Sequence, residues 1–383
     1  MTTDSFSRRQ LGCIIAIAVV GGCIPSLQPL LLSSMLDAGK LSASQIGQAA
    51  MWEGLGMAVS ALIAGAILKP LRLQRIILFA ALIALLANIG TILFGALGIQ
   101  LCRALNGMAS GILLWLVVGL IIRVPSPART FAVYVTAQSV CALLLSLLFS
   151  SLIIPRSGAN GSYLVLAALN LLLLIPVLGI PRAYTLLASQ QRMLRPSVVG
   201  VLGLMVLLLF LAGVMGFWVY VIPIGVELGL DQQSLSYGVS LAIAVQILAG
   251  FAAAVFANRL NGSLVTTVSG LLCALLVFMA PQVDTVSRYF LIIMLFAFLW
   301  MFAPPFHMPF MLRLDSSGQS AMFLSGAQLL GVSLGPLIAA WSVKGGDFSA
   351  AALSSTGLFF TSGLLGLLVI GYTRTRLQDN AVI

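Results

Sequence analysis

Apolar runs separated by short polar turns fill nearly the whole chain. Each run has roughly the twenty residues that a helix needs to cross the hydrocarbon core of a membrane, which is about 30 Å thick. We expect twelve membrane-spanning helices, six on each side of a polar segment at 181–197. The predicted spans are 11–36, 44–68, 76–96, 98–122, 130–154, 162–180, 198–226, 234–257, 264–282, 288–312, 321–342 and 350–373.

The two halves of this pattern repeat each other faintly. The first repeat is Pro29, Asp37, Leu41 and Ser42, which recur with the same spacing as Pro223, Asp231, Leu235 and Ser236. The second is Arg123 and Gln138, which recur as Arg313 and Gln328. An internal repeat of apolar helices indicates an all-α membrane protein made of two pseudo-symmetric bundles, with the working site between them. The predicted domains are a six-helix bundle at 1–180, a linker at 181–197 and a second six-helix bundle at 198–383.

Composition excludes an ordinary soluble domain. Of the 383 residues 61% are hydrophobic and only 7% are charged, whereas soluble domains carry about 25% charged residues. In a soluble protein the net charge of +10 would suggest a nucleic-acid partner, but here the basic residues lie between the apolar runs, so we expect no nucleic acid and instead a lipid bilayer. The five cysteines all fall inside apolar runs and are interpreted as small core residues.

The basic residues also predict orientation. With the N-terminus inside, fourteen of the nineteen Lys and Arg residues lie in inner segments and four in outer loops. The inner set is Arg8, Arg9, Lys69, Arg72, Arg75, Arg123, Arg129, Arg182, Arg192, Arg195, Arg259, Arg313, Arg374 and Arg376, and the outer set is Lys40, Arg156, Arg288 and Lys344. Inner segments of membrane proteins carry the excess of basic residues. Both termini are therefore predicted to be cytoplasmic, in a protein of a bacterial inner membrane.

Three ionisable residues interrupt the spans. Glu53 lies near the middle of the second span, where a low dielectric disfavours the charged form of a carboxyl; it is either a proton carrier or a neutral group hydrogen-bonded to a neighbouring helix. Arg103, in the fourth span, is either functional or a side chain that snorkels to the membrane surface. His307 follows Pro304 and Pro305 in a segment that cannot form an unbroken helix; it marks either a gating hinge or the solvated inner mouth.

The fourth span carries the most specific motif. Arg103-Ala-Leu-Asn106-Gly107, followed by small residues, is similar to the Arg-x-x-Gln-Gly motif of the major facilitator superfamily, with Asn106 in place of Gln. The loop after the second span, from Gly65 to Arg75, keeps the glycine and the basic end of that superfamily's loop motif but lacks its aspartate. The six-plus-six arrangement resembles the same superfamily along the whole chain.

The resemblance implies a carrier whose spans 1, 4, 7 and 10 line a central cavity, flanked by spans 2, 5, 8 and 11. We therefore expect the substrate to contact polar and aromatic side chains on these spans, because binding pockets use a few placed polar groups. The predicted substrate-binding residues are Gln28, Arg103, Asn106, Gln138, Trp218, Tyr220, Trp300 and Gln328, and the predicted proton-coupling residues are Glu53 and His307.

Small residues at four-residue spacing have a structural interpretation. Gly56, Ser60 and Ala64 in the second span, and Gly107 and Gly111 in the fourth, allow helix backbones to approach closely.

Motifs for other chemistry are missing. The sequence holds no Gly-x-x-x-x-Gly-Lys-Ser/Thr phosphate loop, and its single histidine excludes a His-x-x-x-His metal site. We expect no cofactor and no enzymatic activity. The sequence favours a monomeric secondary active transporter that moves a small organic solute by alternating access and is coupled to protons. An efflux pump for hydrophobic or drug-like compounds, and a membrane sensor that kept the fold without transport, are the alternatives.

Overall fold

The structure, a computed structural model, describes residues 6–185, 197–257, 259–315, 318–343 and 345–379, except the side chains of 66, 127, 128 and 373–379. The described residues form helices and one isolated β-bridge, which confirms the all-α class. The chain divides into two compact units, Met1–Gln190 and Gln191–Ile383. Residues 186–196 of the predicted linker lie outside the described part.

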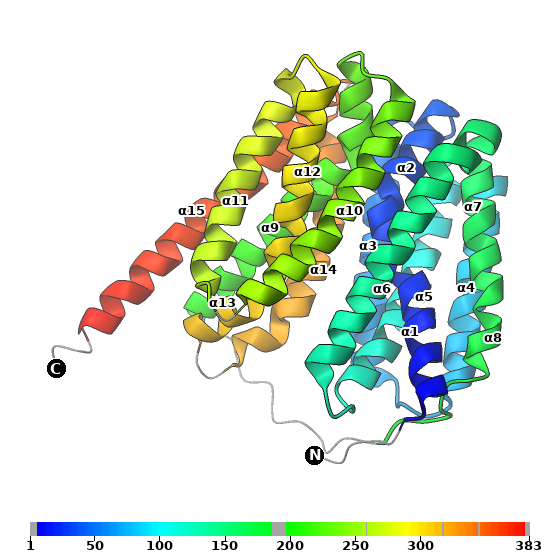
Figure 1. The fold of residues 1–383 in the computed structure, drawn as a ribbon, viewed down its shortest axis with the longest axis horizontal. Helices are drawn as coiled ribbons and strands as arrows, with labels where there is room; N and C mark the ends of the chain where they lie inside the picture. The colour runs from blue at the N-terminus through cyan, green and yellow to red at the C-terminus, as the bar shows by residue number, and fades with distance from the viewer. Residues whose placement is uncertain (1–5, 186–196, 258, 316–317, 344, 380–383) are drawn as a thin grey trace. The chain divides into compact units, whose positions relative to one another are not determined.

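Each unit is a bundle of helices whose order along the chain is shown in Figure 1. The N-terminal unit contains α1 (Arg8–Gly22), α2 (Ile24–Asp37), α3 (Ala43–Ile67), α4 (Leu73–Leu93), α5 (Ala96–Ile121), α6 (Pro127–Leu148), the π-helix η1 (Phe149–Ile153), α7 (Ile154–Leu172) and α8 (Leu174–Val177). The C-terminal unit contains α9 (Val198–Glu227), α10 (Gln232–Phe256), α11 (Gly262–Met279), the 3₁₀ turn η2 (Ala280–Gln282), α12 (Val286–Phe302), η3 (Pro304–Phe306), α13 (His307–Leu314), η4 (Ser320–Phe323), α14 (Leu324–Ser342) and α15 (Ser349–Asp379).

Eleven helical segments of the described part are long and apolar enough to cross a membrane. One of them, Arg129–Val177, has 49 residues and would extend over roughly 74 Å if it were straight, so it contains two spans. The helix α7 is interrupted at Gly158, whose φ of 55° is one that glycine adopts at little cost, so one span lies before this residue and one after it. The described helices therefore provide the twelve predicted spans.

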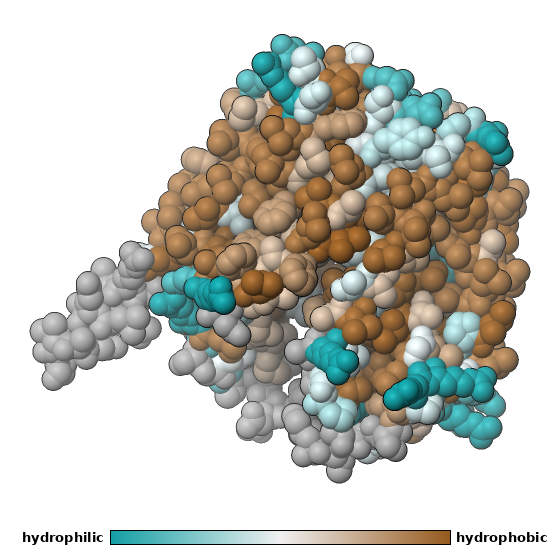
Figure 2. Space-filling model, in the orientation of Figure 1, coloured by the Kyte–Doolittle hydropathy of each residue, from teal (hydrophilic) through white to brown (hydrophobic). Residues whose placement is uncertain are grey.

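The outer surface suits a lipid environment. Figure 2 shows apolar residues across the middle of the visible face and polar residues toward its two ends. Large apolar side chains point outward, among them Leu93, Leu97 and Phe251, which are 72%, 73% and 73% exposed. Exposed apolar surface of this extent is typical of contact with a membrane and not with water.

The internal repeat is visible in which helices pack together. In the N-terminal unit α3 packs on α5, α4 on α7, and α1 and α2 on α6. The corresponding pairs in the C-terminal unit are α10 with α12, α11 with α15, and α9 with α14. The duplicated sequence pattern therefore specifies the same arrangement of helices twice.

Small residues bring α3 and α5 into direct backbone contact. A Cβ atom added to Gly107 would lie 1.9 Å from the Glu53 carbonyl oxygen, and one added to Gly111 would lie 2.1 Å from the Ser60 hydroxyl. Gly56 approaches Ala104 in the same way, at 2.4 Å. The predicted role of these residues in close helix packing is confirmed.

The first span is broken near its middle. Its two parts, α1 and α2, meet at Cys23, just before Pro25. Pro25 has no N–H to continue the hydrogen bonding of α1, and the Ser26 N–H donates to the Cys23 carbonyl instead of continuing the α-helical pattern to Gly22. The Gly22 carbonyl is thus released from helix bonding.

The loop between α3 and α4 is held by the chain that follows α8. Leu71 forms an antiparallel bridge with Ala183. The Arg123 guanidinium, just beyond α5, donates to the Thr185 carbonyl at 3.0 and 3.1 Å and lies 4.9 Å from the centre of the Tyr184 ring. A backbone contact therefore holds the loop whose motif lacks the aspartate of the superfamily pattern, and Arg123 holds the segment that makes this contact.

Candidate functional site

Three residues predicted to carry chemistry meet in the interior of the N-terminal unit. Glu53 lies ten residues, about 15 Å, from the start of α3. Arg103 and Asn106 face it from α5, and their spacing of three residues places them on one face of that helix. Arg103 is 1% exposed and Glu53 is 6% exposed. Because a snorkelling side chain would reach the surface, the burial of Arg103 rules that interpretation out.

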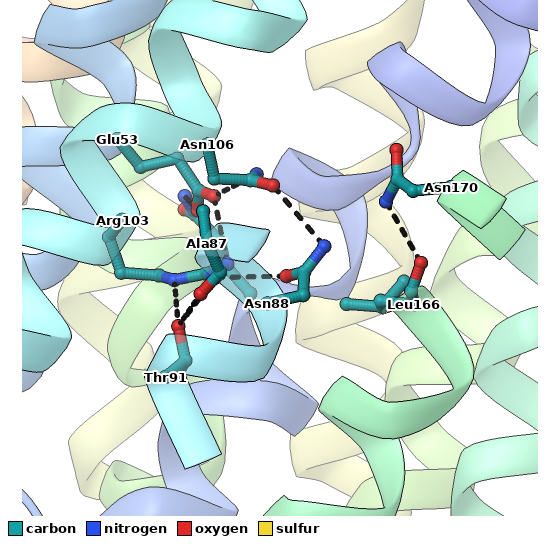
Figure 3. A network of polar contacts seen from close by, with 9 residues as sticks. Glu53, Ala87, Asn88, Thr91, Arg103, Asn106, Leu166 and Asn170 are labelled. Atoms are coloured by element: carbon teal, nitrogen blue, oxygen red, sulfur yellow. Dashed lines mark hydrogen bonds and ion pairs between the residues drawn. The ribbon is translucent and has the colours of Figure 1, made fainter. Parts of the chain in front are cut away.

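The carboxylate of Glu53 contacts side chains from two other helices (Figure 3). Its Oε1 atom accepts a hydrogen bond from Asn106 Nδ2 at 2.8 Å and pairs with Arg103 Nη1 at 3.3 Å. Its Oε2 atom accepts from Nε2 of Gln28 on α2, at 3.2 Å. The carboxylate thus connects α2, α3 and α5 around one buried charge.

The guanidinium of Arg103 is surrounded by acceptors from α4 (Figure 3). Its Nη2 atom donates to Thr91 Oγ1 at 2.7 Å, to Asn88 Oδ1 at 2.9 Å and to the Ala87 carbonyl at 3.4 Å, and its Nε atom donates to Thr91 at 3.2 Å. The ring of Tyr163, on α7, lies 4.6 Å from the guanidinium carbon. All three guanidinium nitrogens therefore have protein partners, which favours the role of charge partner over that of substrate anchor.

The energetics of this pair follow from its burial. Removing two charges from water costs several kcal/mol for each ion, and the pair is stable only because each charge has a close opposite charge and several hydrogen bonds. Protonation of Glu53 would leave the Arg103 cation without its counter-charge.

The partners from α4 and α7 are absent from the sequence-based prediction. Asn88 and Thr91 lie three residues apart in an otherwise apolar stretch. This spacing places both on one face of the helix, so their role as polar partners could have been predicted from the sequence. Asn88 also donates to Asn106 Oδ1 at 3.3 Å. Tyr163 gave no comparable signal, because an aromatic residue near a span end is more often an interfacial anchor.

Gln138 lies away from this network, at the break in the first span. It projects from α6, and its Nε2 atom donates to the released Gly22 carbonyl at 2.7 Å. A side-chain amide thus replaces the missing backbone donor of the broken helix, as buried carbonyl groups require. Its predicted contact with substrate stays a prediction.

His307 lies at a break in the tenth span, as the prolines predict. The helix α12 ends at Phe302, the 3₁₀ turn η3 follows, and α13 begins at His307. The imidazole is completely buried, so its placement at a solvated inner mouth is wrong. The Gln328 side-chain amide lies against it, with Nε2 at 3.0 Å from His307 Nδ1.

The predicted aromatic contacts lie in a cluster of rings in the C-terminal unit. Phe296 contacts Phe217, Trp218, Trp300 and Phe359, with ring centres 4.9–6.5 Å apart. Trp218 also meets Trp300 edge to face at 5.3 Å. These distances are those of favourable aromatic pairs. We call this group, extended through Phe210 to His307, the aromatic cluster.

Tyr220, another predicted contact, packs separately. It is completely buried on α9, and its ring lies 6.1 Å from that of Phe348, which precedes α15. Of the predicted residues, the structure therefore brings together Gln28, Glu53, Arg103 and Asn106, and it places the others elsewhere in their own units.

Comparison with known proteins supports the fold assignment. No family model matches the sequence, and no curated protein is significantly similar to it. A mutant of the nucleoside transporter NupG matches in structure with a TM-score of 0.76 and 14% identity, over 94% of this chain and 99% of that chain. A D-xylose-proton symporter matches with a TM-score of 0.71 and 15% identity, over 94% and 97%. Both are transporters, and each aligns with nearly the whole of this chain. This chain is an integral membrane protein with the fold of these two transporters.

Proposed function

We propose that the protein is a secondary active transporter that couples the movement of a small organic solute to a proton gradient by alternating access. The observation that carries the proposal is the buried Glu53–Arg103 pair within a transporter fold. An ionisable pair at membrane depth is costly and marks ion or substrate pathways by default. No enzymatic activity and no cofactor are part of the proposal.

Glu53 is the proposed proton carrier. Among the described residues it is the only acidic side chain in the interior of a predicted span. Its carboxylate is neutralised either by Arg103 or by a proton, so proton binding changes the forces between α3 and α5. A proton that binds one conformation more tightly than the other shifts the equilibrium between them, which is the requirement for coupling.

The solute class is a small polar organic molecule. Two structural neighbours are a nucleoside transporter and a D-xylose-proton symporter, so nucleosides and pentoses are the first compounds to test. The residues to examine for solute binding are Gln28, Arg103, Asn106, Gln138, Trp218, Tyr220, Trp300 and Gln328, with His307 as a second candidate for proton transfer.

The decisive experiment measures flux in proteoliposomes. Labelled nucleosides and D-xylose should accumulate against their gradients when a pH gradient is imposed and should only equilibrate without one. Glu53→Gln keeps the shape of the side chain and one of its two acceptor oxygens but cannot titrate, so it should abolish accumulation while retaining solute exchange. Accumulation by Glu53→Gln would assign the proton to another group, and the absence of flux for any solute would favour the sensor.

Efflux of hydrophobic compounds is the second candidate, and the aromatic cluster favours it. Rings in an apolar core offer stacking contacts to planar ligands without fixed hydrogen-bond geometry. Dye extrusion from whole cells, in the absence of uptake of nucleosides and pentoses, would establish this alternative.

Localisation and assembly are also proposals. We propose a monomer in a bacterial inner membrane with both termini cytoplasmic, because the basic residues lie mainly in the inner segments. A membrane-impermeant thiol reagent should fail to label Thr2→Cys or Asn380→Cys in intact cells and should label both after permeabilisation. Labelling from outside would reverse the orientation.

A further inference from the structure

The two oxygens of the Glu53 carboxylate accept from different numbers of donors. Oε1 faces two donors, Asn106 Nδ2 at 2.8 Å and Arg103 Nη1 at 3.3 Å. Oε2 faces one, Gln28 Nε2 at 3.2 Å. A proton binds most easily where it displaces the fewest donors and no cation, so Oε2 is the oxygen that would take it.

Gln28 has a free acceptor beside that oxygen. Its side chain is 3% exposed, and its Oε1 atom is buried without a hydrogen-bond partner among the described residues. A buried acceptor of this kind is costly and calls for a reason. The orientation of the amide follows from the charge of its neighbour, because only the NH₂ group can donate to an ionised carboxylate.

We propose that the Gln28 amide flips when Glu53 takes up a proton. This inference rests on the proposed function in one respect, that Glu53 carries the proton. A proton on Oε2 would point at the NH₂ group of Gln28, so two donors would face each other. Rotation of the amide by half a turn places Gln28 Oε1 against the new O–H, and the terminal torsion of Gln allows it because its energy profile is broad and roughly two-fold.

The flip has a consequence on the other side of the amide. In the ionised state Gln28 presents an oxygen acceptor away from Glu53, and in the protonated state it presents an NH₂ donor there. Gln28 lies on α2, five residues after the break at Cys23. Protonation on α3 would thus change the hydrogen-bonding character of the first span. Gln28 is in this sense a positioning residue for proton coupling.

The other titratable groups near Glu53 in the described part make their contacts away from its Oε2 atom. Arg103, from α5, contacts Oε1. Tyr163, from α7, lies with its ring against the guanidinium. The thiol of Cys102, also on α5, lies toward Gly90 on α4.

Infrared difference spectroscopy of the full-length protein in lipid vesicles tests this inference without a solute. The band of the protonated Glu53 carboxyl is identified as the one that appears on acidification and is lost in E53Q. In Q28M, which keeps the length of the side chain and removes both polar atoms, the band should move to higher frequency because its O–H loses an acceptor. Q28N, whose amide is one methylene too short to reach, should give the same shift and retains a polar side chain.

Q48M is the matched control. Gln48 lies on α3, five residues before Glu53, and accepts from Gln100 Nε2 at 2.8 Å, so its loss should leave the Glu53 band in place. An unshifted band in both Q28M and Q28N would overturn the role of Gln28 and leave proton transport by Glu53 intact. The absence of any Glu53 band at every pH where the protein stays folded would overturn the role of Glu53 as proton carrier, and with it the flip. Solute flux in the same vesicles reports separately on transport.

Discussion

The two units share one arrangement of helices, but a buried charge pair lies in the interior of one and a cluster of aromatic rings in the interior of the other. In the N-terminal unit, side chains from α2, α3, α4, α5 and α7 meet around a charge pair. In the C-terminal unit, the aromatic cluster joins α9, α12 and α15. The spacing that pairs Arg123 with Arg313 also pairs Asn106, a partner of Glu53, with Phe296, the centre of the rings.

The internal repeat therefore keeps the contacts between helices more strictly than it keeps the polar side chains between them. Helix contacts depend on small residues and apolar faces, which many sequences satisfy. A charge pair depends on a few particular residues, and replacing one of them with an aromatic residue converts the site into core. The N-terminal unit therefore holds a buried charge pair at a position where the C-terminal unit holds aromatic rings.

The largest effect is expected from Arg103→Ala in the polar unit. This change leaves the Glu53 carboxylate buried without its counter-charge, which costs about 3–5 kcal/mol of unfolding free energy in buried pairs. Transport should be lost, and Arg103→Lys should restore it only in part because an ammonium cannot reproduce the planar fork. Denaturant unfolding in detergent and flux in proteoliposomes provide the two measurements.

The double variant Glu53→Gln with Arg103→Met is the control for that experiment. It removes both charges, so it should regain most of the stability but none of the gradient-driven accumulation. Near-normal transport by Arg103→Ala would show that the charge pair is structural and that the two units do not differ in function.

The next effect, Phe296→Ala in the aromatic unit, should change stability alone. Phe296 is completely buried and contacts four other rings, and truncation of a buried Phe costs about 3–5 kcal/mol. The loss should be the same across the pH range, because the four rings that Phe296 contacts carry no charge. A loss of proton coupling at normal expression would instead give the aromatic cluster a part in the transport cycle.

Close helix contacts allow a matched comparison of the two units. Gly107→Ala would force a Cβ to within 1.9 Å of the Glu53 carbonyl oxygen, and Gly335→Ala would force one to within 2.0 Å of the Ala212 carbonyl oxygen. Both should cost about 1–3 kcal/mol of unfolding free energy, but only Gly107→Ala should also shift the pH dependence of transport, because it moves α3 relative to Arg103. Gly357→Ala, with open space around its Cβ, is the control.

An equal shift of the pH profile by both variants would contradict the difference between the units. It would mean that any disturbance of helix packing affects coupling, and that the charge pair has no special position in it.

The sequence predicts the spans well because they depend on length and hydropathy alone. The helix α3 occupies Ala43–Ile67 against a predicted 44–68, and α9 occupies Val198–Glu227 against 198–226. The least accurate start is that of the sixth span, because the helical turns continue through η1 and Pro155 until Gly158 interrupts them. Turn residues indicate where a chain can bend, and packing decides which of them does.

The candidate site is predictable only in part. Glu53 and Arg103 stand out because charged residues are rare in spans, and their pairing could be anticipated. Gln28 and Gln138 look alike in sequence, yet one contacts the carboxylate and the other a broken helix. Helix rotation decides between such roles, and no local pattern reports it. Tertiary contacts also decide that Trp218 packs among rings within its unit.

The smallest effect concerns the first turns of α3 and α10, which begin the second span of each unit. The N-cap of α3 is Ser42, in a reciprocal pair with Gln45, whereas the N-cap of α10 is Asp231. Hydrogen bonds from the Ser234 backbone N–H and hydroxyl hold the pKa of the Asp231 carboxyl below its ordinary value. Its capping contribution is therefore complete above the unfolded pKa and is lost as the pH falls through the lower, folded pKa.

Hydrogen exchange, corrected for its intrinsic pH dependence, should consequently show the first turn of α10 opening as the solution becomes acidic, while the first turn of α3 stays protected because a hydroxyl and an amide do not titrate there. Asp231→Ser should remove the pH dependence from α10 and make the two helix starts alike. Equal opening of both turns in acid would show that the loosening is global and that the two caps do not distinguish the units.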